Sequence, residues 1–371
     1  MLLSSLEIQR FRTFEYLHIQ KLGQINLIVG RNNVGKSTIL EAIRLYANLG
    51  APQVLLDILD SRDDRFDRDA DLRLAASKEG PAIQHLFHGY PPLRKITEPV
   101  SIGPFNAPDS TLSIGIEWLE PQVAEGGEEQ LVPPENPDLS TGSELTPAIT
   151  LKIGGSKRTF RLDQDFASHF QRWQYQPRSF LDLATPCVCV GPNGLTISEQ
   201  ESLWESIALS DLERDVIESL NIVYPGVEAV AILADSKTGK PSVRVKHPTF
   251  SRPHPLKSLG DGTTRLFGLT LAMVTAQRGI LLIDEIENGV HYSVLPAVWK
   301  FIAKVAKRLD VQVFATSHSL DCIKAFHEVT HADTTIEGVL NRIEIRKGVI
   351  QSVLFDEQKL DRFLDEGIEM R

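Results

Sequence analysis

The stretch Gly30-Arg-Asn-Asn-Val-Gly35-Lys36-Ser37 decides the fold of this chain, because it satisfies the pattern G-x-x-x-x-G-K-[S/T]. Ile25–Val29, directly before it, is an apolar run of the kind that forms a strand buried on both faces. Ser37–Asn48, directly after it, carries apolar residues at helical spacing. A strand, a glycine-rich loop and a helix in this order are the context in which the pattern binds phosphate, which makes a chance glycine-rich turn a poor explanation.

Each part of this loop has a chemical role in holding phosphate. Glycines allow the backbone to wrap an anion with its N–H groups pointing inward, and the positive N-terminus of the following helix faces the same anion. Lys36 is expected to neutralise the β- and γ-phosphates of a nucleotide, and the Ser37 hydroxyl to ligate Mg²⁺. The predicted nucleotide-binding residues of the loop are Gly30, Arg31, Asn32, Asn33, Val34, Gly35, Lys36, Ser37 and Thr38.

A second apolar run, Ile280–Ile283, ends in two acidic residues, Asp284 and Glu285. Ligands of a parallel sheet bind at the carboxyl ends of its strands. We therefore expect Asp284 to join the Mg²⁺ shell and Glu285 to act as the general base that polarises an attacking water. Alone, the pattern fits a strand leaving the core through two solvated acids equally well, but the phosphate-binding loop favours the catalytic interpretation.

Strands and helices alternate in the last third of the chain, which indicates a parallel α/β sheet. Elsewhere, residues 198–222 have a helical pattern, and Ser198-Glu-Gln-Glu201 resembles a capping box. Together with this helical pattern, several strand-like stretches predict an antiparallel β lobe and an inserted helical segment beside the α/β sheet. The strand-like stretches are Leu6–Ile8, Tyr16–Ile19, Thr111–Trp118, Ala148–Ile153, Arg158–Leu162, Val227–Ile232 and Ser242–Lys246.

The charge of the chain is unevenly distributed. There are 39 Lys and Arg residues against 49 Asp and Glu, a net charge of −10. Residues 96–151 contain no Lys or Arg and ten acids, so the remainder of the chain is neutral. The net charge therefore neither supports nor excludes contact with DNA.

Composition and motifs together divide the chain into four parts. Residues 1–118 form the first part of the nucleotide-binding head, and residues 251–371 form the second part. Between them lie residues 148–250, predicted as a β and helical insertion, and residues 119–147, rich in Pro, Gly and Glu and predicted as a mobile acidic loop.

The three cysteines, Cys187, Cys189 and Cys322, have neither the number nor the spacing of a disulfide framework or a zinc site. The N-terminus lacks the basic and apolar regions of a signal peptide, and there is no run of 18 apolar residues. We therefore expect a cytoplasmic protein without a membrane partner.

With two further segments, these motifs resemble the ABC-type heads of the structural-maintenance-of-chromosomes (SMC) and RecF kind among the AAA ATPases. The closest resemblance is to the ATPase of the overcoming-lysogenization-defect (OLD) family of anti-phage defence proteins. The resemblance covers residues 1–48 and 250–330 well and the middle only loosely. The matching segments are the first strand Leu6–Phe14, the signature segment Pro255–Gly262, the Walker B segment Ile283–His291 and the switch strand Val311–Ser319.

The resemblance implies an α/β P-loop NTPase fold of the ABC type with a mixed central sheet, and it adds residues to the site. Ser258 and Gly260 would contact the γ-phosphate held by another subunit, so that two heads form a head-to-tail dimer around ATP. His318 would contact the γ-phosphate from the same chain as a catalytic sensor. Arg12 would lie near the nucleotide base or phosphates, and a surface salt bridge remains the alternative.

Two departures and one charge pattern leave questions open. Leu259 replaces the first glycine of the transporter signature L-S-G-G-Q, which argues against a transporter ATPase. No residue is clearly the glutamine of the family's Q-loop; Gln84 is a candidate, with an ordinary surface glutamine as the alternative. One face of the predicted helix Val294–Arg308 carries four basic residues and could be either a DNA-facing stripe or a solvated face: Lys300, Lys304, Lys307 and Arg308.

The stretch after His318 is too short for the TOPRIM nuclease domain of full-length OLD proteins, and residues 50–250 lack the heptads of a coiled-coil arm. The first hypothesis is therefore an ATP-hydrolysing, Mg²⁺-dependent subunit that controls a separate effector, a nuclease, in anti-phage defence. The alternatives are a RecF-like ATPase that clamps DNA and an ATP-bound scaffold that does not hydrolyse. Glu285 speaks against the scaffold.

Overall fold

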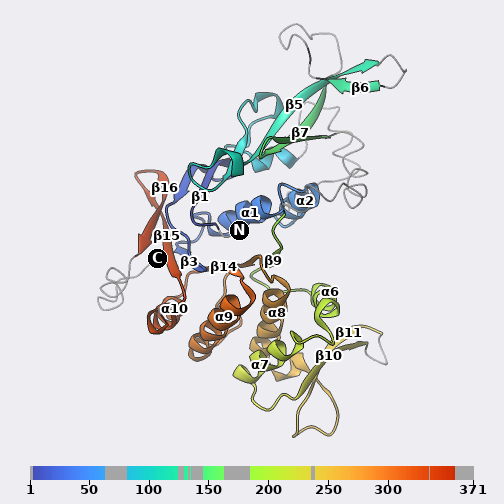
Figure 1. Ribbon diagram of the computed structural model, residues 1–371, viewed down its shortest axis with the longest axis vertical. Coiled ribbons are helices and arrows are strands. Elements are labelled where there is room, and N and C mark those ends of the chain that lie inside the picture. Colours follow the sequence, from blue (N-terminus) through green and yellow to red (C-terminus); the bar gives the residue numbers. More distant parts are fainter. Residues whose placement is uncertain are drawn as a thin grey trace. The chain divides into compact units, whose positions relative to one another are not determined.

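The computed structural model describes residues 3–62, 82–123, 129–132, 134, 145–162, 184–234, 239–333 and 335–355 (Figure 1). The chain divides into two compact units. The first unit consists of Met1–Ser4, Ile19–Leu40 and Thr185–Arg371, and the second of Ser5–His18 and Glu41–Ala184.

The first unit is built on a six-stranded sheet with the order β16-β15-β3-β14-β13-β9. Neighbouring strands from β15 to β9 are parallel, and β16 is antiparallel to β15, so the sheet is mixed as predicted. Every residue of β3, β13 and β14 is buried, as expected for strands covered on both faces. The strands are β3 (Ile25–Gly30), β9 (Cys187–Val190), β13 (Ile280–Ile283), β14 (Gln312–Ser317), β15 (Gly338–Arg346) and β16 (Val349–Phe355).

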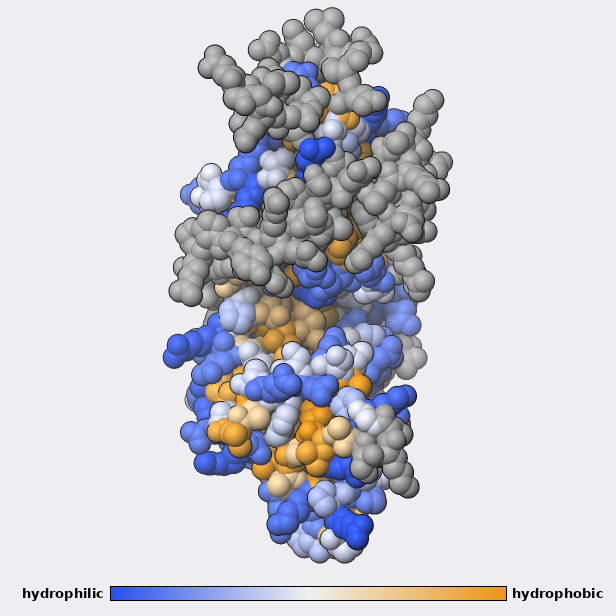
Figure 2. Space-filling view, turned by 90° about the vertical axis from the view of Figure 1, so that its right-hand side faces the viewer, coloured by the Kyte–Doolittle hydropathy of each residue, from blue (hydrophilic) through white to orange (hydrophobic). Residues whose placement is uncertain are grey.

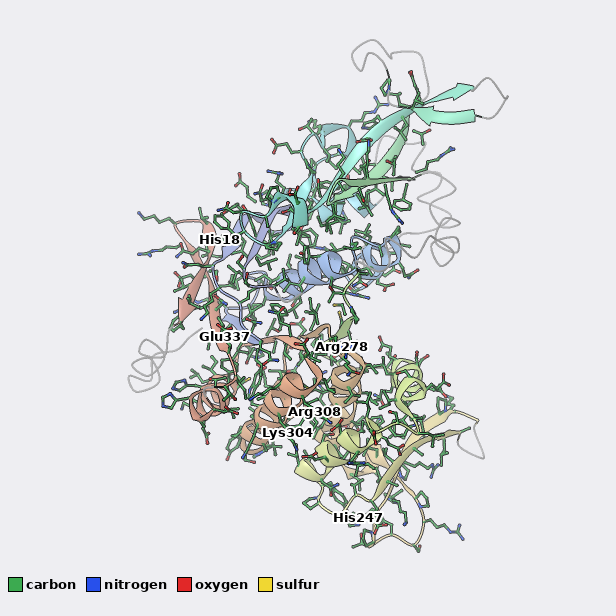
Figure 3. The ribbon with its side chains drawn as sticks, in the orientation of Figure 1. His18, His247, Arg278, Lys304, Arg308 and Glu337 are labelled. Atoms are coloured by element: carbon green, nitrogen blue, oxygen red, sulfur yellow. The ribbon has the colours of Figure 1, made fainter. Side chains whose placement is uncertain are left out.

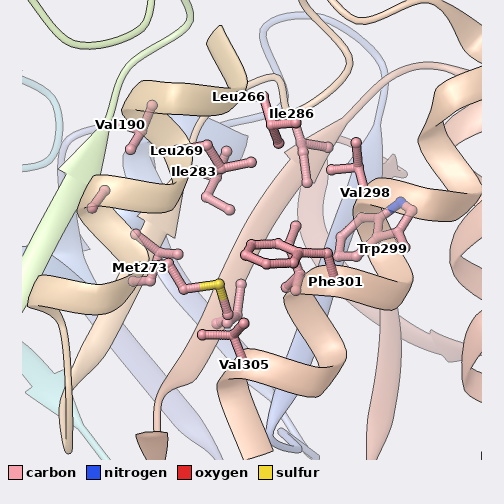
Figure 4. Close-up of a cluster of buried hydrophobic side chains, with 14 of the residues drawn as sticks. Val190, Leu266, Leu269, Met273, Ile283, Ile286, Val298, Trp299, Phe301 and Val305 are labelled. Atoms are coloured by element: carbon pink, nitrogen blue, oxygen red, sulfur yellow. The ribbon is translucent and has the colours of Figure 1, made fainter. Parts of the chain in front are cut away.

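Helices α6 to α10 of this unit, whose bounds are given below, pack on the sheet through a continuous hydrophobic core. In Figure 4, Met273 of one helix meets Phe301 and Val305 of another beside Ile283 of β13. Full burial of such a side chain stabilises the fold by about 1.5–3 kcal/mol. The helices are α1 (Lys36–Ala47), which continues into the second unit, α6 (Ile197–Ile207), α7 (Glu213–Val223), α8 (Asp261–Thr275), α9 (Leu295–Leu309) and α10 (Leu320–Ala332).

The predicted helix over residues 198–222 is wrong in one respect, because it is two helices, α6 and α7, separated by a turn. The capping box also lies two residues earlier than predicted. The Thr196 hydroxyl accepts a hydrogen bond from the Glu199 N–H at 3.3 Å, and the Glu199 carboxylate accepts one from the Thr196 N–H at 2.7 Å. A three-stranded sheet follows, formed by β10 (Ala229–Ala234), β11 (Pro241–Lys246) and β12 (His254–Pro255).

The second unit contains a seven-stranded sheet with the order β2-β1-β4-β5-β7-β8, with β6 paired to β5. The pairs from β1 through β4, β5 and β7 to β8 are antiparallel, which confirms the predicted antiparallel lobe. Its elements are β1 (Leu6–Phe11), β2 (Phe14–Ile19), α2 (Pro52–Asp60), β4 (Val100–Gly103), β5 (Leu112–Val123), β6 (Glu129–Val132), β7 (Thr146–Ile153) and β8 (Ser156–Arg161), with short 3-10 turns at Ala82–Leu86, Leu93–Lys95 and Pro108–Ser110.

The predicted acidic loop over residues 119–147 differs from the structure at its edges. Strand β5 runs on to Val123, and β6 pairs with that extension, Glu120 lying opposite Val132. Pairing satisfies backbone hydrogen bonds whatever the side-chain composition, so an acidic sequence is no obstacle to a hairpin. Residues 124–128, 133 and 135–144 of the predicted loop lie outside the described residues.

Within the described ranges, no helix has both the length and the apolar character needed to cross a bilayer. Figure 2 shows hydrophobic residues at the surface, interrupted by hydrophilic ones. Among the exposed large hydrophobic residues of the first unit, Leu209 is 99% exposed, in the turn between α6 and α7.

Candidate active site

The phosphate-binding loop follows β3 and takes its shape from its own backbone. Gly30 has φ +152°, and a Cβ there would lie 2.4 Å from the Ile343 carbonyl oxygen of β15, so only glycine fits. Asn33 and Gly35 also have positive φ, at 63° and 96°, conformations for which Asn and Gly are the favoured residues. The loop ends where α1 begins at Lys36, and the first N–H groups of a helix have no partner within it. The local geometry is therefore that of an anion cradle.

Lys36 lies folded over this loop. Its side chain is buried, and its ammonium donates hydrogen bonds to the Gly30 carbonyl at 2.8 Å and to the Arg31 carbonyl at 2.9 Å. Burial lowers the pKa of Lys36, while the nearby carboxylates of Asp284, Glu285 and Glu287 raise it. The structure thus brings the predicted lysine and the predicted acidic strand end into one electrostatic site.

Thr316 orients both acids at the end of β13. Strands β13 and β14 are parallel neighbours, with Ile283 opposite Ala315, so Thr316 lies beside the end of β13. Its fully buried hydroxyl donates to Asp284 Oδ1 at 2.5 Å and accepts from the Glu285 N–H at 2.8 Å. A single hydroxyl on the adjacent strand therefore sets the direction of the Asp284 carboxylate and the backbone of Glu285.

Asn288 fixes the other end of Glu285. Its side-chain amide donates to Glu285 Oε2 at 2.6 Å, and its backbone N–H donates to the Glu285 carbonyl at 3.0 Å. A carboxylate held in one orientation is what a general base needs, because proton transfer requires a fixed distance to the water.

His318 lies at the end of β14 and is paired with Glu287. Glu287 Oε1 accepts a hydrogen bond from the His318 backbone N–H at 2.9 Å and lies 3.2 Å from His318 Nδ1. The histidine side chain is 43% exposed, and the glutamate 11%. Both line an open cavity of about 560 Å³ with Tyr292, Asp321 and Lys324 among its other walls. Glu287 therefore sets the orientation of the imidazole.

The signature segment leads directly into α8. It forms a short 3-10 turn at Leu256–Leu259, followed by Gly260 with φ +116°, and α8 begins at Asp261. A Cβ on Gly260 would meet none of the described residues within 4 Å, so the backbone conformation, not space, requires glycine there. The Ser258 hydroxyl donates to the Pro255 carbonyl at 2.6 Å. Ser258 and Gly260 are both exposed, which leaves them accessible to a second molecule.

Comparisons with known proteins bear on the family and the fold of the chain. Residues 1–77 match the family described as "AAA ATPase domain", and residues 152–321 match the family described as "AAA domain, putative AbiEii toxin, Type IV TA system". A solved SMC head, bound to the C-winged helix domain of ScpA, is 13% identical with a TM-score of 0.51 and covers 98% of this chain and 100% of its own. This likeness shows the fold of an ABC-type P-loop ATPase head.

The chain is an ATPase.

Two further proteins are similar to this chain. The ATPase is 21% identical over 353 residues to an "ATP/GTP phosphatase" of Helicobacter pylori, an alignment that covers 88% of each chain. The SMC head domain from Thermotoga maritima is 14% identical with a TM-score of 0.47, covering 96% of this chain and 100% of its own. The resemblance to the OLD family remains a prediction.

The oxygen ligands at the site fit Mg²⁺. Mg²⁺ is usually bound by one or two protein oxygens together with water and substrate phosphates, not by a full protein cage. The Ser37 hydroxyl and the Asp284 carboxylate are hard oxygen donors of this kind. Within the part of the chain that the structure describes, no group of three or more His, Cys, Asp or Glu residues could hold a metal by itself.

Arg12 has a different environment from the one that its resemblance implies. It lies in the second unit, where its side chain is 6% exposed and its Nε is 3.0 Å from the Glu41 carboxylate. Its guanidinium also donates to the Ile58 carbonyl. This is the salt-bridge alternative, buried rather than at the surface, and a nucleotide contact of Arg12 stays a prediction. Gln84, the Q-loop candidate, also lies in the second unit.

The basic stripe on α9 is largely engaged within the ATPase. Lys304 pairs with Glu218 of α7, and Arg308 lies 2.5 Å from Asp215 of the same helix. Lys307 donates to the Thr335 hydroxyl at 2.7 Å. Figure 3 shows Lys304 and Arg308 near one another on α9. The two ion pairs join α9 to α7, and all three contacts weaken the interpretation of the stripe as a DNA-binding face.

Sequence reasoning missed the residues that orient the site: Thr316, Glu287 and Asn288. Thr316 could have been found from the register of the two strands. Ile283 of β13 pairs with Ala315 of β14, so the next residues, Asp284 and Thr316, lie side by side. Three strands of the central sheet were also not predicted: β9, β15 and β16.

Proposed function

We propose that the ATPase binds Mg²⁺-ATP in the loop Gly30–Thr38 and hydrolyses it with the residues at the ends of β13 and β14. The observation that carries this proposal is the shared hydroxyl of Thr316, which orients Asp284 and Glu285 next to Lys36. Thr316 fixes the Asp284 carboxylate and the Glu285 backbone, and Asn288 fixes the Glu285 carboxylate.

Each residue has a distinct task in this proposal. The loop N–H groups and Lys36 bind and neutralise the phosphates, and Ser37 and Asp284 hold Mg²⁺, which supplies charge stabilisation when bound. Glu285, held by Asn288, accepts the proton of the attacking water. His318, held by Glu287, donates toward the γ-phosphate.

The exposed signature segment supports a dimer around ATP. Ser258 and Gly260 precede α8, whose N-terminus carries a partial positive charge that attracts anions. We place this segment against the γ-phosphate bound by a second copy, so that two ATP molecules lie between two heads. Sedimentation of the purified chain with Mg²⁺ and a non-hydrolysed ATP analogue tests this step. Association is expected, and a monomer at all nucleotide concentrations would contradict it.

The dimer is proposed to control a separate effector, a nuclease, in an anti-phage defence complex. The support is the resemblance to OLD-family ATPases and the match to a family described by a toxin of a toxin–antitoxin system. The second candidate, a RecF-like clamp on DNA, requires a basic surface, and the pairing of α9 with α7 argues against the one that the sequence suggested. The non-hydrolysing scaffold is disfavoured by the fixed carboxylate of Glu285.

Steady-state phosphate release, measured with and without double-stranded DNA, separates these candidates. The effector-control proposal expects Mg²⁺-dependent turnover that DNA alone leaves unchanged. A large stimulation by DNA favours the clamp, and nucleotide binding without turnover favours the scaffold.

A further inference from the structure

Arg265 is a buried arginine next to the proposed catalytic base. It lies four residues into α8, and its relative exposure is 9%. A buried guanidinium is costly unless its N–H groups are hydrogen-bonded, so its partners indicate its purpose.

The guanidinium of Arg265 joins the loops that follow two neighbouring strands. Nη1 donates to the carbonyls of Gly191 at 2.7 Å and Pro192 at 3.2 Å, beyond β9. Nη2 donates to the carbonyls of Asp284 at 3.1 Å and Glu285 at 3.3 Å, beyond β13. The carboxylates of Asp284 and Glu285 also lie close enough to oppose the lowering of the Arg265 pKa by burial. One side chain therefore binds the backbone that follows β9 and the backbone that follows β13.

The backbone of Glu285 needs such support. Glu285 has φ +50°, in the left-handed region that non-glycine residues rarely adopt. Its N–H is held by Thr316, and its carbonyl accepts from both Asn288 and Arg265. Strained conformations of this kind persist when the surrounding structure imposes them, and they cluster at functional sites.

Helix α8 touches the same segment at a second point. A Cβ on Gly262, in the first turn of α8, would lie 2.9 Å from the Gly289 carbonyl oxygen, so the helix and the segment after β13 are in close contact there. Arg265 and Gly262 are both on α8, which begins directly after Gly260 of the signature segment.

We propose that Arg265 is a positioning residue that holds Glu285 in its left-handed conformation and so aims the carboxylate at the attacking water. The inference rests on the proposed role of Glu285 as the general base. It also makes the first turn of α8, and with it the signature segment, part of the support of that base.

The first test compares Arg265→Lys with wild type in steady-state ATP hydrolysis. Lysine keeps the charge but offers its donors from one point, so it cannot bridge both loops. Loss of these charge-assisted hydrogen bonds predicts a kcat lower by about 10- to 100-fold. KM for ATP is expected to change by less than about threefold, because the phosphate-binding loop is untouched. The matched control is Arg214→Lys, whose side chain is 83% exposed on α7 and whose kcat should equal that of wild type.

A double-mutant cycle with Glu285→Gln then separates positioning from general structural support. If Arg265 acts through Glu285, the double variant turns over no more slowly than Glu285→Gln alone. If the two losses multiply, or if Arg265→Lys leaves kcat unchanged, the inference is wrong. A wild-type level of turnover in Glu285→Gln would instead overturn the proposed base, which keeps the two failures distinct.

Gly262→Ala covers the case in which Arg265→Lys does not fold. It removes no charge and no hydrogen-bonding side chain, but its methyl group must displace the Gly289 carbonyl. The same fall in kcat with KM preserved is expected, again without additivity to Glu285→Gln. A fully active Gly262→Ala would contradict the support of Glu285 by α8.

Discussion

The phosphate-binding loop and the carboxylate pair lie at the ends of two strands of one sheet, β3 and β13, and they are constructed in different ways. The loop takes its shape from its own glycines and from the start of α1, and Lys36 bonds to carbonyls only five and six residues away. Thr316, which is 31 and 32 residues distant along the chain, holds the Glu285 backbone N–H and the Asp284 carboxylate. A binding loop can therefore be encoded locally, whereas a catalytic pair depends on the register of neighbouring strands.

The largest expected effect is in the phosphate-binding loop, at the glycine that lies against β15. Gly30→Ala places a methyl group 2.4 Å from the Ile343 carbonyl oxygen, in a conformation that favours glycine. We expect loss of measurable ATP binding and a free energy of unfolding lower by about 2–4 kcal/mol. Equilibrium dialysis with labelled ATP and urea denaturation measure the two effects.

Gly115→Ala is the matched control, since among the described residues its methyl group would meet only Pro99 Cβ at 3.6 Å, an ordinary contact. Normal ATP binding by Gly30→Ala would show that the loop does not take its shape from this glycine.

Thr316→Val tests how the neighbouring strand orients Asp284 and Glu285, because it removes the Thr316 hydroxyl and nearly preserves the side-chain volume. The Glu285 N–H and the Asp284 carboxylate each lose a partner, so kcat is expected to fall by about 10- to 100-fold. ATP affinity measured without Mg²⁺ should stay within about threefold of wild type. Thr316→Ser keeps the hydroxyl and should retain most of the activity. Equal activity of the Val and Ser variants would remove Thr316 from the account.

The features that the sequence predicts are the locally encoded ones, and the features that it does not predict depend on distant contacts. The strand, loop and helix around Lys36 were predicted to within a residue at the helix start, because glycine pattern and apolar periodicity are local signals. The central mixed sheet and the antiparallel lobe were also predicted. The break between α6 and α7, strand β9 and the roles of Thr316 and Arg265 were not, since they depend on contacts between distant segments.

Ser258→Arg tests the proposed contact between the signature segment of one head and the ATP bound by another. It is expected to change ATP binding by a single head very little. Ser258 is exposed, and its hydroxyl donates to the Pro255 carbonyl. A bulky arginine there should abolish nucleotide-driven association while ATP binding by each monomer stays within about twofold of wild type. Lys257→Arg, at the adjacent exposed position, is the control. Dimerisation of Ser258→Arg at wild-type nucleotide concentrations would argue against a signature contact.

The smallest effect is expected from shortening the acidic segment. Leu119 and Thr146 are cross-strand partners in β5 and β7, so residues 120–145 can be replaced by an Asn-Gly turn. All proposed catalytic residues lie in the first unit, whereas this segment lies in the second, so kcat should stay within about twofold of wild type. A loss of hydrolysis by this folded variant would mean that the segment is not peripheral.

The most direct test of the central claim is a phosphate-release measurement on Glu285→Gln with saturating Mg²⁺-ATP. Glutamine keeps the shape of the side chain and cannot accept the proton of water at neutral pH. The account predicts retained ATP binding with kcat lower by about 10²–10⁴-fold. Glu337→Gln should hydrolyse ATP at the wild-type rate, because Glu337 (labelled in Figure 3) is an exposed acid whose ion-pair partner is Lys21. Unchanged phosphate release by Glu285→Gln would contradict the assignment of the catalytic base at the end of β13.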